Sequence, residues 1–140
     1  MAHPQLDNLA RIGKLKAERA EIGEIEGLLR SGQRRLGDAQ RQELSLESRF
    51  DLGYNAAHAC ALSALRAHGY RSDSRYLVFQ CLQHTIDLPA EQWRVLDDAH
   101  RKRNLAEYEG ATDVDEQLLS ALIRVTREVA TRVENLIVQR

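Results

Sequence analysis

The chain has 140 residues, a length that suits one domain of ordinary size and leaves little room for a second. Its formal net charge of −1 excludes a molecule that is polycationic as a whole, although the 20 Lys and Arg residues could still form a local basic patch. With only 2 Pro and 5% aromatic residues beside many Ala, Leu, Glu, Gln and Arg, the composition favours an all-α fold.

The first 17 residues predict a short helical extension ahead of the main bundle, because apolar residues recur near one face (Leu6, Leu9, Ile12 and Leu15). This segment lacks the apolar h-region of a signal peptide. No run in the chain approaches the roughly 20 apolar residues of a membrane-spanning helix. We therefore expect a cytoplasmic protein with no membrane association.

From about Glu18 the sequence predicts the first long helix. Its apolar residues recur at spacings of three, four and seven, as one buried stripe requires (Ile22, Ile25, Leu29, Leu36 and Ala39). Glycines at positions 23, 27, 32 and 37 each weaken an exposed helix by about 1 kcal/mol relative to alanine. Alternatively, they allow a neighbouring helix to approach closely, and tertiary packing must then supply the lost stability.

Ser45 predicts the start of the next helix, which runs to about His68. This helix has a surface of small side chains (Ala56, Ala57, Ala61 and Ala64). Because small side chains let helix axes approach closely, we expect it to be the central helix of a bundle. Gly69 is placed to end it in the left-handed conformation.

Three more helices are expected in the second half of the chain. The first covers about residues 74–85, and the next has Pro89 in its first turn and reaches about Glu109. Thr112 or Asp113 then caps a long last helix with an apolar stripe over residues 114–137. No strand is expected, so the prediction is a single domain over residues 1–140, an antiparallel up-and-down bundle of four or five helices.

The two cysteines lie in separate apolar helical stretches, at Cys60 and Cys81. Neither has a Cys or His neighbour at zinc-ligand spacing, and two cysteines are too few for a disulfide framework. We therefore expect buried free thiols in a reducing compartment, and neither a metal site nor a cofactor.

Three stretches of the sequence resemble the HEPN family. Residues 49–58 (RFDLGYNAAH) are similar to the aromatic-x-Ala-Ala-x-His run of that family's central helix. Residues 69–71 (GYR) with the helix after them form the second stretch. Residues 100–110 (HRKRNLAEYEG) resemble the family's Arg-Asn-x-x-x-Tyr signature, carried here by Arg103, Asn104 and Tyr108. Together the stretches cover about half of the chain, in the family's order.

The resemblance implies a HEPN-like helical bundle that often forms homodimers and interacts with nucleotide or RNA. Some members are metal-independent ribonucleases that act as toxins, and a partner nucleotidyltransferase neutralises them as the antitoxin. Those members use an Arg followed within about six residues by a His, whereas here Tyr108 stands at the position of that His. The candidate catalytic residues are therefore Arg103, Asn104, Tyr108 and His100.

Helical spacing gives an independent reason to expect a site on this helix. Leu96, His100, Arg103 and Glu107 step by four, three and four residues, so their side chains share a face that begins apolar and becomes polar. The planar guanidinium of Arg103 suits a phosphate, and Asn104 could hold a ribose or phosphate oxygen. The alternative is an ion pair of Arg103 with Glu107 and a solvated basic run that includes Lys102.

A wider set of side chains is predicted to contact nucleic acid (Arg49, Tyr54, His58, Lys102, Arg103 and Glu107). Tyr54 and His58 are four residues apart on one helix face, and Tyr54 and Asn55 could line a groove with Arg49. The alternative for Tyr54 and His58 is ordinary packing in the bundle core, with the imidazole satisfied by one hydrogen bond.

Metal-free RNA cleavage would need a proton acceptor with a pKa near 7. Tyr108, whose ordinary pKa is about 10, is a poor base at neutral pH, so His100 or His58 would have to take that role. Three functions remain open at this point. They are a domain that binds nucleotide or RNA with little or no cleavage, a ribonuclease toxin, and a structural or partner-binding helical module.

Overall fold

A computed structural model describes residues 3–109 and 114–139, with backbone only for residues 107–109. Apart from one small β-ladder, every regular element of the described chain is a helix. The elements in chain order are α1 (Pro4–Arg11), β1 (Lys16–Ala17), α2 (Ile22–Ala39), α3 (Leu46–Ala67), β2 (Tyr70–Arg71), α4 (Arg75–Gln80), α5 (Leu82–Thr85), α6 (Ala90–Glu109) and α7 (Glu116–Val138). The prediction of an all-α protein is confirmed at this level.

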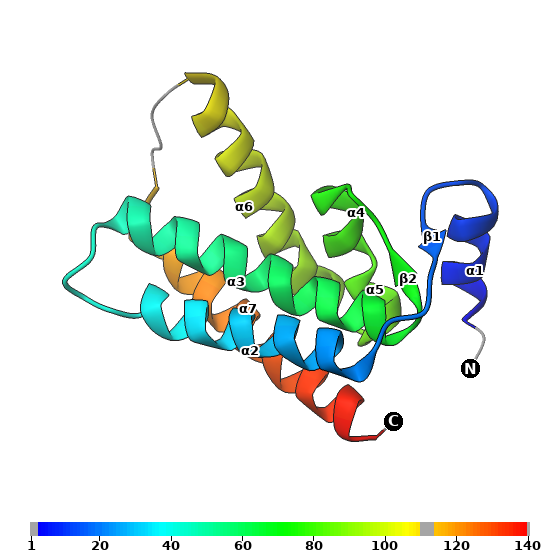
Figure 1. Cartoon of the computed structure of the whole chain (residues 1–140). Coiled ribbons are helices and arrows are strands. Elements are labelled where there is room, and N and C mark those ends of the chain that lie inside the picture. Colours follow the sequence, from blue (N-terminus) through cyan, green and yellow to red (C-terminus); the bar gives the residue numbers. More distant parts are fainter. Residues whose placement is uncertain (1–2, 110–113, 140) are drawn as a thin grey trace.

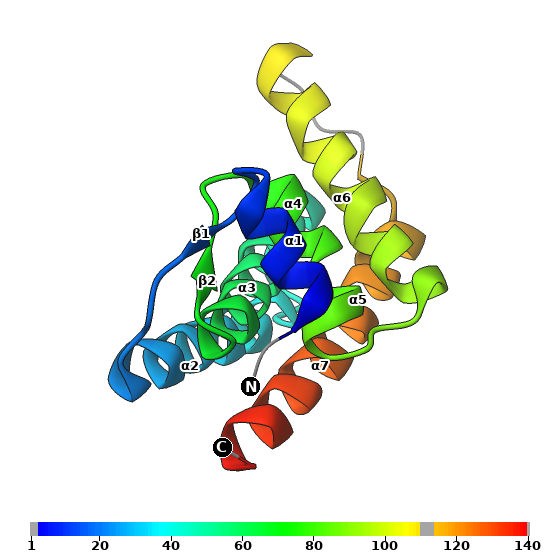
Figure 2. The same ribbon diagram turned by 90° about the vertical axis from the view of Figure 1, so that its right-hand side faces the viewer.

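Helix α3 lies at the centre of the fold (Figure 1). Helices α2 and α7 pack against α3 and against each other, while α4, α5 and α6 cover another part of its surface. Figures 1 and 2 both show the C-terminal half of α6 extending beyond the other helices. Among the described residues, no helix combines the length and the apolar character needed to cross a membrane.

The small residues of α3 explain its central place. Most of the helix is buried, including Ala56, Ala57 and Ala64 at 0% exposure. On α2, a Cβ added at Gly32 would collide with Sγ of Cys60 and lie 3.0 Å from the carbonyl oxygen of Ala56. Gly32 therefore permits the close approach of α2 and α3, as one of the two interpretations of the α2 glycines predicts.

The ends of α3 follow the sequence signals. The hydroxyl of Ser45 accepts a hydrogen bond from the Ser48 amide at 3.1 Å, which caps the first turn. After His68 the chain turns through Gly69 at φ +87°, the left-handed conformation expected there. The cap expected for the last helix is wrong. Asp115 caps α7 by accepting from the Leu118 amide, and Thr112 and Asp113 lie outside the described residues.

The expectation that the chain contains no strand is also wrong, by a small margin. Lys16 and Ala17 of β1 pair antiparallel with Arg71 and Tyr70 of β2. Two residues are too few to show the alternation that predicts a strand, so the ladder exists only through the tertiary fold. It ties the N-terminal segment, with α1, to the end of α3. The predicted helix over residues 74–85 is likewise divided, at Cys81, into α4 and α5.

Both cysteines are free and buried. Burial raises the pKa of Cys60 to about 12 and the pKa of Cys81 to about 11, because the apolar surroundings disfavour the thiolate. The prediction of buried free thiols is confirmed. Neither sulfur is ionised near neutral pH, so both act as small apolar side chains in the core.

Candidate functional site

The polar face of α6 emerges from the core at the position that the spacing predicts. Leu96 is fully buried, His100 is half-buried, and the Arg103 side chain is 27% exposed. The side chain of Glu107, one turn further on, lies outside the described residues, as does that of Tyr108. Nε of Arg103 lies 3.7 Å from a carboxylate oxygen of Asp51 on α3, while the alternative ion pair of Arg103 with Glu107 stays a prediction.

A buried tyrosine on α3 lies under two arginines. The Tyr54 ring is 0% exposed, with the Arg103 Cζ 4.8 Å and the Arg75 Cζ 5.5 Å from its centroid. Arg103 comes from α6 and Arg75 from the first turn of α4, so three helices meet at this ring. The electron-rich ring attracts the guanidinium groups, which brings both cations to this one side chain.

His100 and Asn104 complete this group, which we name the Tyr54 cluster (Tyr54, Arg75, His100, Arg103 and Asn104). The Tyr54 hydroxyl lies 2.8 Å from Nδ1 of His100, and Nδ2 of Asn104 lies 3.3 Å from Nε2 of the same ring. With the Asn104 amide donating to Nε2, Nδ1 carries the proton and donates to the hydroxyl oxygen of Tyr54. Both ring nitrogens of His100 are thus engaged inside the protein, and the histidine links α6 to α3.

His58 lies one turn along α3 from Tyr54, and its ring centroid is 6.0 Å from that of Phe79. Its pKa is lowered from 6.5 to about 4, first by burial and then by the positive charges of Arg75 and Arg103. The imidazole is therefore neutral at pH 7, and its weak basicity makes it a poor proton acceptor there.

The structure thus brings together four predicted site residues, Tyr54, His100, Arg103 and Asn104, and places His58 next to them. Arg49 lies elsewhere. Nε of Arg49, in the first turn of α3, donates to the carbonyl oxygen of Ala39, the last residue of α2, at 2.8 Å. Tyr54 belongs to the site as a buried support and has no exposed surface to touch a ligand. Lys102 is half-buried on α6.

Sequence reasoning missed Arg75, which bonds to Asn55, a residue that the sequence offered as packing or as lining a groove with Arg49. Nη1 of Arg75 donates to Oδ1 of Asn55 at 3.1 Å, and Nδ2 of Asn55 donates to the carbonyl oxygen of Asp51 at 2.9 Å. Arg75 forms no ion pair with any residue in the described part of the chain. No motif identifies Arg75, because its role depends on how α4 packs against α3. The one sequence signal was the basic residue directly after the predicted helix cap Ser74.

A pocket of about 300 Å³ continues from the Tyr54 cluster along α3. It is lined by Glu24, His58, Leu62, Arg66, Arg71, Ser72, Asp73 and Arg75, and we name it the His58 pocket. Tyr54, His58, Leu62 and Arg66 follow one another in steps of four, so one face of α3 runs from the cluster into the pocket. Arg75 belongs to both.

The far wall of the His58 pocket is held by the Arg66 network, which comprises Arg66, Glu18, Glu24 and Arg71. The Arg66 side chain is 5% exposed and its Nε lies 2.8 Å from a carboxylate oxygen of Glu24. Its other nitrogens donate to the backbone carbonyl of Tyr70 in β2 and to those of Glu18 and Arg19 in the segment after β1, that of Glu18 at 2.7 Å. The hydrogen bond from Arg66 lowers the pKa of Glu24. The guanidinium of Arg66 is thus occupied by the protein itself.

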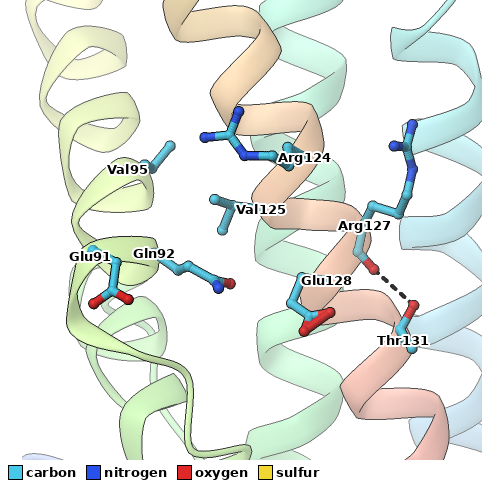
Figure 3. A pocket seen from close by; sticks show the side chains of 8 residues that line it. All are labelled: Glu91, Gln92, Val95, Arg124, Val125, Arg127, Glu128 and Thr131. Carbon is cyan, nitrogen blue, oxygen red and sulfur yellow. Dashed lines mark hydrogen bonds between the residues drawn. The ribbon is translucent and has the colours of Figure 1, made fainter.

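A second pocket, of about 650 Å³, lies between α6 and α7 (Figure 3). Val95 and Val125 face each other across it, Arg124 lies at one end, and Glu91 and Glu128 lie at the other. Although larger, this pocket contains none of the predicted site residues. The Tyr54 cluster and the His58 pocket therefore remain the stronger candidate site.

Within the described ranges, no group of three or more His, Cys, Asp or Glu side chains is placed to hold a metal ion. No protein-family model, curated protein or solved structure matches this chain in comparisons with known proteins.

Proposed function

We propose that this chain is a HEPN-like domain that binds nucleotide or RNA through the Tyr54 cluster. The observation that carries the proposal is the pair of guanidinium groups, from Arg75 and Arg103, held over one buried tyrosine ring. Phosphate is the common anion whose oxygens match the planar donors of arginine. Asn104, on the same side of α6, adds an amide that could reach a ribose or phosphate oxygen.

The cluster has charges suited to binding and groups unsuited to cleavage. His100 uses both ring nitrogens within the protein, and His58 has a pKa of about 4. The ring nitrogens of His100 are therefore not directed at a ligand, and His58 is too weak a base at neutral pH to favour attack by a ribose hydroxyl. We therefore propose binding with little or no cleavage. Purified protein should leave single-stranded RNA intact, and cleavage that is lost in the Arg103→Ala variant would instead favour a ribonuclease toxin.

The same proposal includes a homodimer, in which two Tyr54 clusters would present twice the positive charge to one nucleic acid. The projecting half of α6 supports this proposal, because it carries Leu105 at 53% exposure beside the cluster. A nucleotidyltransferase partner, acting as antitoxin, is proposed only for the alternative in which this chain is a ribonuclease toxin. Sedimentation of the pure protein gives the oligomeric state, and co-purification tests the partner.

The central test measures fluorescence anisotropy of a labelled single-stranded RNA at low salt. We expect Arg103→Ala to weaken binding by about tenfold or more, since a charge-assisted hydrogen bond contributes about 1.5–3 kcal/mol. Arg101→Ala is the matched control, because Arg101 lies two residues away on α6, is 67% exposed and pairs with Asp97 and Asp98. Equal binding by the wild type and both variants would refute the proposal.

A further inference from the structure

We propose that the His58 pocket receives the nucleoside of a single phosphate-bearing nucleotide whose phosphate is held by Arg75 and Arg103. The inference rests on the proposed function and narrows it from anion binding in general to recognition of one nucleotide unit. That unit is either a free mononucleotide or one residue of an RNA strand, since both present the same phosphate, ribose and base.

Arg75 connects the phosphate position to the pocket. Its guanidinium and that of Arg103 both lie over the Tyr54 ring, and the Arg75 side chain also lines the His58 pocket. Its described partners are the amide of Asn55 and the ring of Tyr54, both uncharged. A phosphate bound by Arg75 would thus lie next to the pocket, which could receive the rest of the molecule.

The size of the pocket fits one nucleoside. A volume of about 300 Å³ lies at the small end of the range for ligand pockets, which suits a single base with its ribose. Leu62 and the neutral ring of His58 give it an apolar and aromatic side, against which a base could stack.

The charges inside the pocket favour one orientation of the bound nucleotide. Arg66, Arg71 and Glu24 are paired within the Arg66 network, and the Ser72 hydroxyl accepts from the Ser74 amide. Asp73 forms neither a hydrogen bond nor an ion pair with another described residue. Its carboxylate repels phosphate and accepts hydrogen bonds from ribose hydroxyls or base amino groups. The phosphate is thereby directed to Arg75 and Arg103, and the donors of the nucleoside to Asp73.

The test compares affinities by calorimetric titration at low salt for inorganic phosphate, for each of the four common ribonucleoside monophosphates, and for a short 5′-phosphorylated single-stranded RNA. We expect at least one monophosphate to bind about tenfold more tightly than phosphate, and Asp73→Asn to reduce that ratio at least about fivefold, because it removes a charged acceptor. Asp38→Asn, on the exposed face of α2, is the matched control. Leu62→Trp, which fills the pocket, should reduce the ratio as well.

The possible results separate the two proposals. Wild-type protein that binds RNA through Arg103, but binds monophosphates no more tightly than phosphate, overturns the nucleoside pocket and leaves the proposed function standing. The nucleoside pocket is also overturned if the ratio of monophosphate affinity to phosphate affinity is unchanged in both Asp73→Asn and a folded Leu62→Trp variant. Absence of any binding by the wild type defeats both. If only the free monophosphates respond to Asp73→Asn, the ligand is a free nucleotide, and if the RNA responds as well, it is a unit of a strand.

Discussion

Two arginine-rich groups lie on the same face of α3, and they differ in what surrounds the charge. In the Arg66 network, a guanidinium that is 5% exposed meets carboxylates of Glu18 and Glu24 and backbone carbonyls. In the Tyr54 cluster, the partners of Arg75 among the described residues are an amide and an aromatic ring, and Nε of Arg103 lies 3.7 Å from a carboxylate oxygen of the exposed Asp51. The first arrangement stabilises the fold, whereas the second keeps cations at the surface where an anion can reach them.

This contrast shows how to tell a structural arginine from a candidate binding arginine on one helix. A buried cation needs strong partners, because removing it from water costs several kcal/mol. A partly exposed cation over an aromatic ring has no such requirement and can exchange water for a ligand. Substitution of Arg66 should therefore lower the stability of the fold, whereas substitution of Arg75 or Arg103 should mainly weaken ligand binding.

The largest effect on stability is expected for Arg66→Met, which should lower the free energy of unfolding by about 3 kcal/mol. The substitution removes the hydrogen bonds of Arg66 to the backbone carbonyls of Glu18, Arg19 and Tyr70, which tie the segment after β1 to α3. Urea denaturation measures the loss. Arg71→Met is the control, because Arg71 belongs to the same network but is exposed, and it should change stability little. Equal losses in the two variants would contradict this assignment.

A smaller effect is expected from the protonation of His58. The unfolded residue titrates near 6.5 and the folded residue near 4. Between these values the unfolded chain binds more protons, so His58 contributes stability that is present above pH 6.5 and declines as the pH falls toward 4. Because the ring is partly exposed, we expect a loss of about 1–2 kcal/mol across this range.

The contribution of His58 is isolated by comparing urea denaturation of the wild type and His58→Gln at several pH values between 7 and 4.5. The pKa of His84 is also lowered by burial, with the same sign of effect, and this contribution remains in both proteins. The difference in free energy of unfolding between the wild type and His58→Gln should become smaller as the pH falls. Parallel curves would show that His58 titrates alike in the folded and unfolded chains.

Tyr54→Phe should lower the free energy of unfolding by about 1 kcal/mol, because His100 loses its hydrogen bond to the phenol in a buried place. We also expect weaker RNA binding, since the link from Tyr54 through His100 to Asn104 no longer positions the amide. Tyr76→Phe is the control, because the Tyr76 hydroxyl pairs with Gln80 at the exposed surface. Binding equal to that of the wild type would assign Tyr54 a packing role alone.

The smallest effect on stability is expected for Arg75→Ala, at less than about 1 kcal/mol, although this variant should bind RNA less tightly. Arg75 has no carboxylate partner in the described chain, and its contact with Tyr54 is the main interaction lost. Thermal denaturation and RNA anisotropy on the same sample check the two halves of the prediction. A large loss of stability with unchanged binding would place Arg75 with Arg66 as a structural arginine.

Much of the helical framework could be read from the sequence, since it depends on local signals. The periodicity of apolar residues predicts α2, α3, α6 and α7, and Ser45 and Gly69 mark the ends of α3 as observed. The step from Leu96 through His100 to Arg103 correctly predicts a helix face that passes from core to surface. Helix periodicity fixes which side chains share a face whatever the surroundings, so these features needed no knowledge of the fold.

The tertiary structure alone decided which faces meet. It brought Arg75 and Arg103 to the buried ring of Tyr54, bonded Arg49 to Ala39 instead, and paired β1 with β2. Each of these depends on contacts between residues distant in the chain, and no local pattern encodes them. The charge environment of an arginine is likewise set by its distant neighbours, which is why Arg66 and Arg103 look alike in the sequence and differ in the folded protein.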